Sequence, residues 1–185
     1  MTALSFDNET FKKSVKALAL HASTDNARPT LTGILFEDNA MVATDSYTMA
    51  YWEPMEQFSV NVPFIVPAKE LLNAIKPMKG KTITLSVENT TWEVSDGLAS
   101  AKSELISSEF PAWRNLLPNG HSGDHFAETR LSATFMRRLS DASLAIHKDH
   151  ALVLDHWESP IKPILFTTTT NIGCLTQLIC PIRKA

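Results

Sequence analysis

Residues 4–22 read LSFDNETFKKSVKALALHA, a short alternating run that leads into an amphipathic one. Phe11, Val15 and Leu18 recur at helical spacing and define one apolar face, and Asn8 is the expected N-cap. The basic residues on the other side of this expected helix are Lys12, Lys13 and Lys16. The stretch therefore predicts a strand followed by a helix with a basic outer face.

The same pattern recurs in residues 64–81 (FIVPAKELLNAIKPMKGK) and 130–143 (RLSATFMRRLSDAS). Pro67 suits a first helical turn, Pro77 limits the length of that helix, and Ser132 is the expected N-cap of the third helix. The apolar faces are Leu71, Leu72 and Ile75 in one helix, and Phe135, Met136 and Leu139 in the other. The outward cations are Lys69 and Lys76, then Arg137 and Arg138.

Each expected helix is followed by strand-like runs, which predicts an α+β fold built from a repeated strand, helix and multistrand unit. The runs cover residues 30–38 and 40–52, then 82–89, 91–96 and 100–106, and finally 150–157, 162–170 and 174–182. Phe6, Val66 and Leu131 begin the three repeats. A polar, Pro-rich and Gly-rich stretch then predicts a linker at 119–124, between a complete domain at 1–118 and a half domain at 125–185.

Positive charge is concentrated in the three helical windows 8–21, 67–81 and 132–143. They hold nine of the 17 Lys and Arg residues but three of the 20 Asp and Glu residues, so they carry +6 while the remainder carries −9. For a single helix, a solvated surface explains such charge well. Three matching helices in an acidic chain favour a shared polyanionic partner instead.

Several functional classes are not supported by the sequence. No apolar run reaches the length of a membrane span and no secretory signal opens the chain, so we expect a cytoplasmic protein without a membrane partner. Cys174 and Cys180 fall in one strand-like stretch, about 20 Å apart and beyond disulfide reach. The chain lacks GxSxG, phosphate-loop and HExxH motifs, so we expect no catalytic residues, no metal and no cofactor.

Four stretches of sequence point to a known protein family. They are RPTLTGILFED (28–38), MVATDSYTMA (41–50), FIVPAKELL (64–72) and SELISSEFPAWRNLLP (103–118). In this order and spacing they resemble the middle domain of the bacterial replicative DNA polymerase sliding clamp. Residues 125–185, which contain LICPIR, resemble the second half of the last clamp domain. The resemblance implies a DNA clamp fold, with basic helices lining a ring around duplex DNA and antiparallel sheets outside.

The resemblance also implies two sites, neither of them catalytic. Channel residues that contact DNA without reading its sequence would be Lys12, Lys13, Lys16, Arg28, Lys69, Lys76, Arg137 and Arg138. A pocket for short peptides of the replicative polymerase and the clamp loader would be formed by Leu31, Thr44, Tyr47, Met49, Pro163, Leu178, Ile179, Pro181, Ile182 and Arg183. The family's Gly-His-Arg-Leu after ATD is replaced here by residues 46–49, Ser-Tyr-Thr-Met, which leaves partner preference open.

The chain holds three repeat units, whereas the resemblance implies that clamp rings close with twelve. A closed ring would then need four copies, so we expect a homo-oligomer and favour a tetramer. The resulting prediction is a DNA polymerase processivity factor. The alternative left open is a clamp-derived adaptor or decoy that binds replication proteins without encircling DNA.

Overall fold

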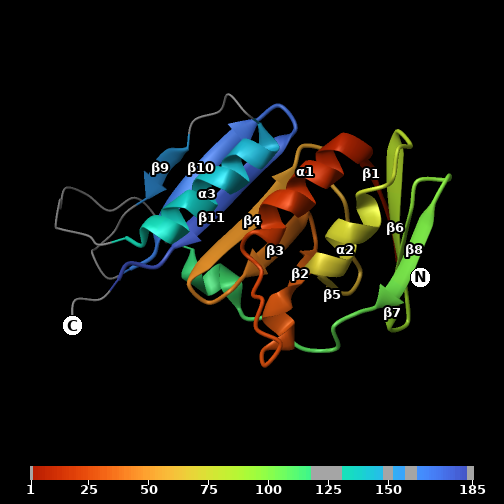
Figure 1. The fold of residues 1–185 in the computed structure, drawn as a ribbon, viewed down its shortest axis with the longest axis horizontal. Coiled ribbons are helices and arrows are strands. Elements are labelled where there is room, and N and C mark those ends of the chain that lie inside the picture. Colours follow the sequence, from red (N-terminus) through yellow and green to blue (C-terminus); the bar gives the residue numbers. More distant parts are fainter. Residues whose placement is uncertain (1, 118–130, 148–151, 157–161, 183–185) are drawn as a thin grey trace.

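The structure is a computed structural model, and it describes residues 2–117, 131–147, 152–156 and 162–182 (Figure 1). Within these ranges the helices are α1 (Asn8–Ala19), α2 (Ala68–Ile75) and α3 (Ala133–Ile146), with short 3-10 turns η1 (Pro29–Thr32) and η2 (Trp113–Leu116). The strands before the gap are β1 (Thr2–Asp7), β2 (Gly33–Glu37), β3 (Ala40–Thr44), β4 (Thr48–Pro54), β5 (Phe64–Pro67), β6 (Thr82–Glu88), β7 (Thr91–Ser95) and β8 (Ser100–Glu104). The later strands are β9 (Val153–His156), β10 (Ile164–Thr170) and β11 (Gly173–Ile179).

All three predicted helices are present, but one predicted cap is wrong. Asp7, and not Asn8, caps α1, because its carboxylate accepts the Thr10 amide at 2.8 Å. Asn8 is instead the first helical residue, buried, with its side-chain amide donating to the Gly80 carbonyl. The cap predicted for α3 is confirmed, since the hydroxyl of Ser132 accepts the Phe135 amide at 3.4 Å.

The first two units exchange their leading strands. β1, which precedes α1, pairs with β6 of the second unit, and β5, which precedes α2, pairs with β2 of the first. This exchange ties the two units into one body. For the third unit, Leu131 lies just before α3 and outside any described strand, and the predicted linker 119–124 lies outside the described residues.

The strands form one four-stranded and one seven-stranded antiparallel sheet, in the orders β1-β6-β7-β8 and β5-β2-β3-β4-β11-β10-β9. The run 40–52, predicted as one strand-like segment, is two strands joined by a tight turn at residues 45–47. The larger sheet joins the predicted domain and half domain, because β11 pairs with β4 over its whole length. In that register Met49 lies opposite Leu178.

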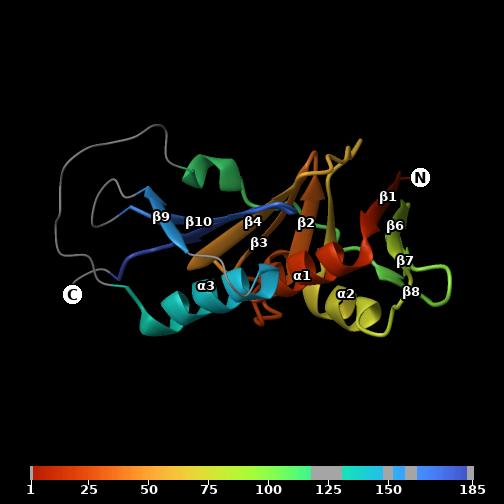
Figure 2. The ribbon, with the colours of Figure 1, turned by 90° about the horizontal axis from the view of Figure 1, so that it is seen from above.

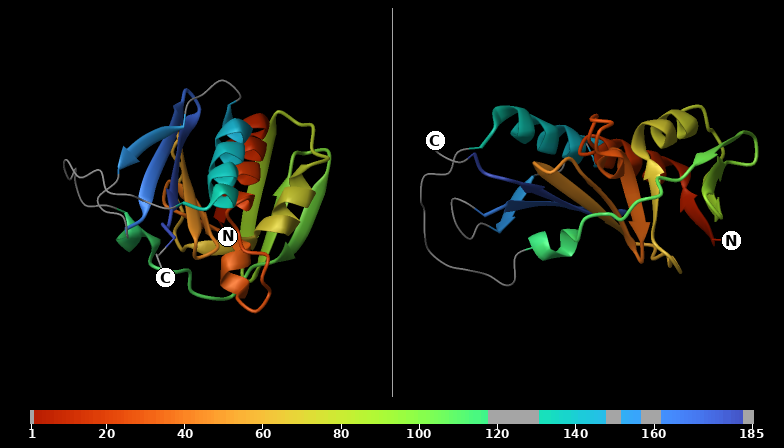
Figure 3. Two further views of the ribbon diagram at one scale, coloured as in Figure 1. Left: turned by 60° about the vertical axis from the view of Figure 1, so that its left-hand side comes forward. Right: turned by 90° about the horizontal axis from the view of Figure 1, so that it is seen from below.

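The helices form a single layer over one face of both sheets (Figure 2). Their spatial order is α3, α1, α2, so the third unit packs against the first and not against the second (Figures 1 and 3). The main apolar core lies between this layer and the sheets, with Phe11, Val15, Leu71 and Ile75 from the helices. The predicted apolar faces of α1 and α2 are therefore buried, although Leu72 is only half-buried.

A buried polar network crosses the junction between the first and third units. His21, just beyond α1, lies 3.0 Å from the Gln177 side-chain oxygen, and the Gln177 amide donates to the Ser143 hydroxyl at 2.9 Å. The Thr168 hydroxyl donates to the same Ser143 oxygen at 2.8 Å. Burial lowers the pKa of His21 from 6.5 to about 4, so this imidazole is neutral at pH 7 and donates through Nε2.

Over the described ranges, no helix combines the length and the apolar character needed to cross a membrane. Cys174 and Cys180 are both free thiols.

Candidate DNA-facing layer and peptide pocket

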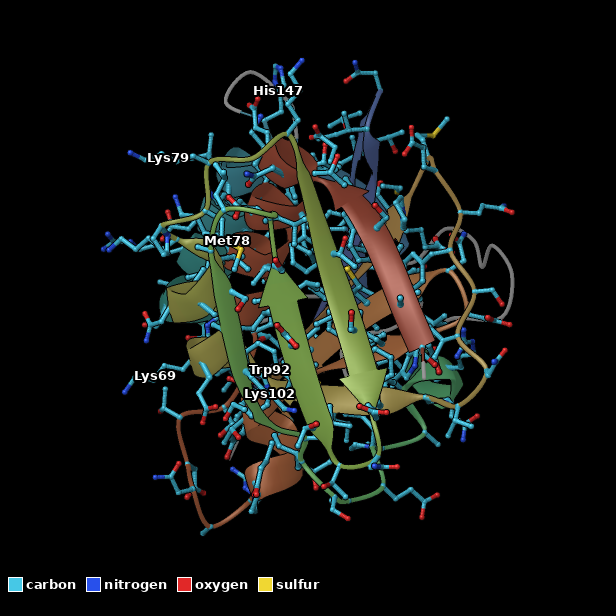
Figure 4. The ribbon with its side chains drawn as sticks, turned by 90° about the vertical axis from the view of Figure 1, so that its right-hand side faces the viewer. Lys69, Met78, Lys79, Trp92, Lys102 and His147 are labelled. Atoms are coloured by element: carbon cyan, nitrogen blue, oxygen red, sulfur yellow. The ribbon has the colours of Figure 1, made fainter. Side chains whose placement is uncertain are left out.

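The first candidate site is the outer surface of the helix layer. Lys16, Lys69 and Lys76 are exposed there, and Lys69 projects away from the sheets together with Lys79 (Figure 4). Arg137 on α3 keeps 84% of its side chain exposed and lies 3.6 Å from Asp141. These cations come from three helices that share one layer, so one extended anion could meet them together.

Three further predicted cations are partly engaged within the protein. Lys12 is half-buried and donates to the Met78 carbonyl, and Lys13 forms an ion pair with Glu9 at 2.7 Å. The Arg28 guanidinium donates to the Ser46 hydroxyl at 3.2 Å and approaches Asp25 at 3.4 Å. Their partners use part of the charge that the sequence analysis assigned to DNA.

A groove of about 450 Å³ opens on this side, between the end of α1 and the start of α2. Ser23, Thr24 and Asn26 line it from the loop after α1, and the oppositely charged Lys69 and Glu70 line it from α2. The groove therefore adds neutral hydrogen-bonding groups to the cationic layer. This groove could not be predicted from the sequence, because the loop and the helix come from different units.

The eighth predicted cation, Arg138, does not face outward, which corrects the sequence prediction. It lies beneath α3, with a quarter of its side chain exposed, and forms an ion pair with Asp45 in the β3–β4 turn. Its guanidinium also donates to the Thr48 hydroxyl at 3.0 Å and lies 5.3 Å from the centre of the Phe135 ring. It shares a helix face with Phe135 and the buried Ala142, three residues before it and four after it, and this face lies toward the sheet.

The second candidate site is a small cavity of about 40 Å³ where the β3–β4 turn meets the end of β11. Its lining residues are Thr44, Ser46, Tyr47, Thr48, Met49, Leu116, Pro163, Leu178 and Cys180. Five of the predicted pocket residues are thus brought together, namely Thr44, Tyr47, Met49, Pro163 and Leu178. The pairing of β4 with β11 is what places the two predicted walls side by side.

Other predicted pocket residues lie elsewhere. Ile179 is wrong as a lining residue, because alternation along β11 turns it to the helix side, where it packs with Leu139, Ile164 and Phe166. Leu31 is buried on η1 and is not among the lining residues. The tail residues Pro181 and Ile182 follow the strand, half-buried and half-exposed respectively, and Arg183 lies outside the described residues.

Sequence reasoning missed four of the lining residues. Ser46 and Thr48 belong to the turn that carries the predicted Tyr47, and Leu116 and Cys180 come from elsewhere in the chain. Leu116 comes from η2, a turn that follows the second unit and reaches the pocket across the outer side of the sheet. Its position in the apolar pair Leu116-Leu117, after Trp113, was the available signal. Cys180 stands between predicted residues of the tail, and its amide donates to the Tyr47 carbonyl at 3.1 Å.

The turn that forms one pocket wall is held by the Asp45 carboxylate. It accepts the Tyr47 amide at 2.9 Å and the Thr48 amide at 2.8 Å, and Ser46, between Asp45 and Tyr47, has φ of 79°. Burial acts to raise the pKa of Asp45, but the hydrogen bonds from the two amides and from Arg138 outweigh it and hold the pKa below its usual value. Asp45 is therefore ionised at neutral pH.

Tyr47 stands at the rim of the cavity with 56% of its surface exposed. Its ring stacks on Phe135 of α3, with 5.7 Å between ring centres. The wall is thus joined to α3 by an ion pair at Asp45 and by an aromatic contact at Tyr47. Within the described ranges, no cluster of His, Cys, Asp and Glu could hold a metal ion.

Comparisons with known proteins agree on one family. Residues 5–112 match the sequence model of the family described as DNA polymerase III beta subunit, central domain. GriR of Streptomyces muensis, a beta sliding clamp homolog, is 28% identical over 162 residues, which are 82% of this chain and 42% of that protein.

Solved structures with the same fold include the DNA polymerase III beta subunit of Thermotoga maritima, at 14% identity and a TM-score of 0.77, with 100% of this chain and 66% of that chain covered. A Caulobacter crescentus beta sliding clamp has a TM-score of 0.78 at 14% identity, with the same coverage. A Bartonella birtlesii sliding clamp bound to griselimycin has a TM-score of 0.77 at 15% identity, with 98% of this chain and 66% of that chain covered. This chain therefore spans 42% to 66% of the length of these proteins.

Proposed function

This chain belongs to the DNA polymerase III beta subunit family, and from that premise we propose that it is a sliding clamp that holds duplex DNA and docks replication proteins. The observation that carries the proposal is the single layer of three helices with outward cations, Lys16, Lys69, Lys76 and Arg137. Lys12, Lys13 and Arg28 supplement this layer despite their internal partners. The fold itself is that of the clamp structures.

The chemistry of the layer suits movement along DNA. Duplex DNA carries one negative charge per about 1.7 Å of axis, so scattered ammonium and guanidinium groups attract it at any sequence. Contacts to phosphates carry no sequence information, because base edges are not read. A protein held by such contacts alone binds strongly and slides.

A charge-reversal experiment tests this role. We expect Lys16→Glu with Lys69→Glu to weaken duplex binding and to flatten the dependence of the logarithm of the binding constant on the logarithm of salt by about 2. The matched control is Lys102→Glu on β8. Ser103 faces the helix layer, where its hydroxyl donates to Glu70 of α2, and Lys102, the residue before it, faces the opposite side of the sheet. Equal salt dependence in the double variant and the control would count against the helix layer as the DNA face.

We further propose that four copies close into a ring, because three units per chain supply twelve in a tetramer. Four chains of 20.5 kDa give about 82 kDa, which light scattering can measure. A ring loaded on circular DNA stays bound until the circle is cut, whereas an open protein dissociates at a rate set by salt. A solution mass of 20.5 kDa with and without DNA would overturn the tetramer.

The 40 Å³ pocket is the proposed docking point for short peptides of polymerases and clamp loaders. It combines apolar walls, Met49 and Leu178, with the exposed ring of Tyr47, a composition suited to a short apolar segment. We expect a labelled clamp-binding peptide to bind the chain and Met49→Ala to weaken that binding. Peptide affinity unchanged by Met49→Ala would place docking elsewhere.

The second candidate function is an adaptor or decoy that binds replication proteins without encircling DNA. It is favoured by the formed pocket at the β3–β4 turn, which needs no closed ring to accept a peptide. The two functions differ in their behaviour on circular DNA. An adaptor would bind the peptide and leave intact circles as readily as cut ones.

A further inference from the structure

Arg138 occupies the point where α3 meets the pocket. Its guanidinium contacts the Asp45 carboxylate, the Thr48 hydroxyl and the face of Phe135 at the same time. Tyr47 stacks on the same Phe135 ring. One side chain of α3 therefore touches the turn directly and also supports the ring against which the turn's aromatic residue rests.

The turn depends on this contact for its position. The amide bonds that Asp45 accepts from Tyr47 and Thr48 fix the internal shape of the turn, but they do not attach it to α3. The ion pair and the stacking of Tyr47 on Phe135 make that attachment. The ion pair is shielded, with 11% of the Asp45 side chain and 25% of the Arg138 side chain exposed. Losing Arg138 would leave a shielded carboxylate without its countercharge, which favours movement of the turn toward water.

The opposite pocket wall does not share this dependence. Leu178 and Cys180 belong to the end of β11, which is fixed by pairing with β4 and β10. The backbone of the turn is joined to this wall by the bond from the Cys180 amide to the Tyr47 carbonyl. The side of the turn that faces α3 is held through Arg138 and Phe135, so the position of the Tyr47 ring depends on α3. A preformed pocket binds more tightly than one that must be assembled, because affinity scales with the fraction of molecules already in the binding conformation.

We propose that Arg138 is a positioning residue of the peptide pocket, holding the Asp45–Tyr47 turn against α3 so that the Tyr47 wall is preformed. This inference rests on the proposed peptide-docking function. It assigns to Arg138 a role in docking, distinct from the DNA contact that the sequence suggested. Arg137, its exposed neighbour, stays with the DNA-facing layer.

The test measures the affinity of the intact chain for a fluorescent clamp-binding peptide by anisotropy. If the turn keeps its binding conformation in about a tenth of the Arg138→Met molecules, the peptide binds about tenfold more weakly. Arg138→Lys keeps the positive charge but lacks the planar guanidinium group, so we expect peptide affinity between those of the unaltered chain and Arg138→Met. Asp45→Asn keeps an acceptor for the two amides and loses the countercharge, so it should match Arg138→Met, and the double variant should be no weaker than either.

Two controls separate positioning from folding and from DNA contact. Lys102→Met removes one exposed positive charge from β8 and should leave peptide affinity within about twofold. Phe135→Leu removes the ring on which Tyr47 stacks and leaves the Arg138–Asp45 ion pair intact. It therefore tests the position of the same turn if Arg138→Met fails to fold. DNA retention by Arg138→Met should stay close to that of the unaltered chain.

The outcomes are distinct. If the unaltered chain binds no clamp-binding peptide, the proposed docking function fails. If it binds and a folded Arg138→Met binds equally well, the positioning role fails while docking stands. If Arg138→Met loses DNA retention and keeps its peptide affinity, the residue belongs to the DNA site and this inference is overturned.

Discussion

The buried His21 makes stability depend on pH in a way that can be calculated. It lies fully buried between the first and third units, with Nε2 at 3.0 Å from Gln177 Oε1. Its Nδ1 has no hydrogen-bond partner within the described residues. Replacing it with Gln removes the titration while keeping an amide donor that can reach the Gln177 oxygen.

The sign follows from the two pKa values. The pKa of His21 is about 4 in the folded state and 6.5 in the unfolded state, so the unfolded state binds more protons between these values. Stability therefore rises with pH through this window and is lost on acidification. The loss is about 2 kcal/mol between pH 7 and pH 5, and reaches about 3 kcal/mol at pH 4.

The assay is urea unfolding of the unaltered chain and of His21→Gln at pH 7 and pH 5. Both proteins share every other titrating group, so the difference between their pH effects isolates His21. We expect the unaltered chain to lose about 2 kcal/mol more than the variant over this interval. Equal losses would refute the claim that the folded protein holds this imidazole neutral.

Three further predictions concern local structure. Gly173→Ala should lower the free energy of unfolding in urea by roughly 2–3 kcal/mol, because a Cβ there would meet the Trp52 ring and the Glu53 carbonyl at 2.6 Å. Removing the α1 cap with Asp7→Ala should cost about 1 kcal/mol in thermal unfolding, and unchanged stability would contradict the capping role. Asp96→Asn should speed hydrogen exchange at the Gly80 amide, which the carboxylate now accepts at 2.7 Å, and unaltered exchange would argue against that contact.

The helices could be predicted because their signals are local. Apolar residues at helical spacing placed Phe11, Val15 and Leu18 correctly, and the hydroxyl of Ser132 caps α3 as its position suggested. The cap of α1 was misplaced by one residue, because Asp7 and Asn8 are both good caps and only the backbone decides between them.

The contacts of Arg138 could not be predicted, because they depend on a partner from another unit. Helical spacing puts Arg138 at the edge of the apolar face, where its direction is set by what lies beneath the helix. Asp45 lies there only because β11 pairs with β4 and brings α3 over the β3–β4 turn. Ile179 was misassigned for a related reason, since the direction of each β11 side chain depends on register.

The pairing of β4 with β11 also has a consequence for how the chain folds during synthesis. The strand pairings that join the first two units, β1 with β6 and β5 with β2, lie within residues 2–117, whereas β11 is synthesised later. Until then β4 presents an open, apolar edge, a form prone to pairing with other chains. We expect β11 to add slowly to a preformed template, because pairing between distant segments is the slow step of folding. The interval between synthesis of β4 and arrival of β11 is then when this protein is most exposed to aggregation.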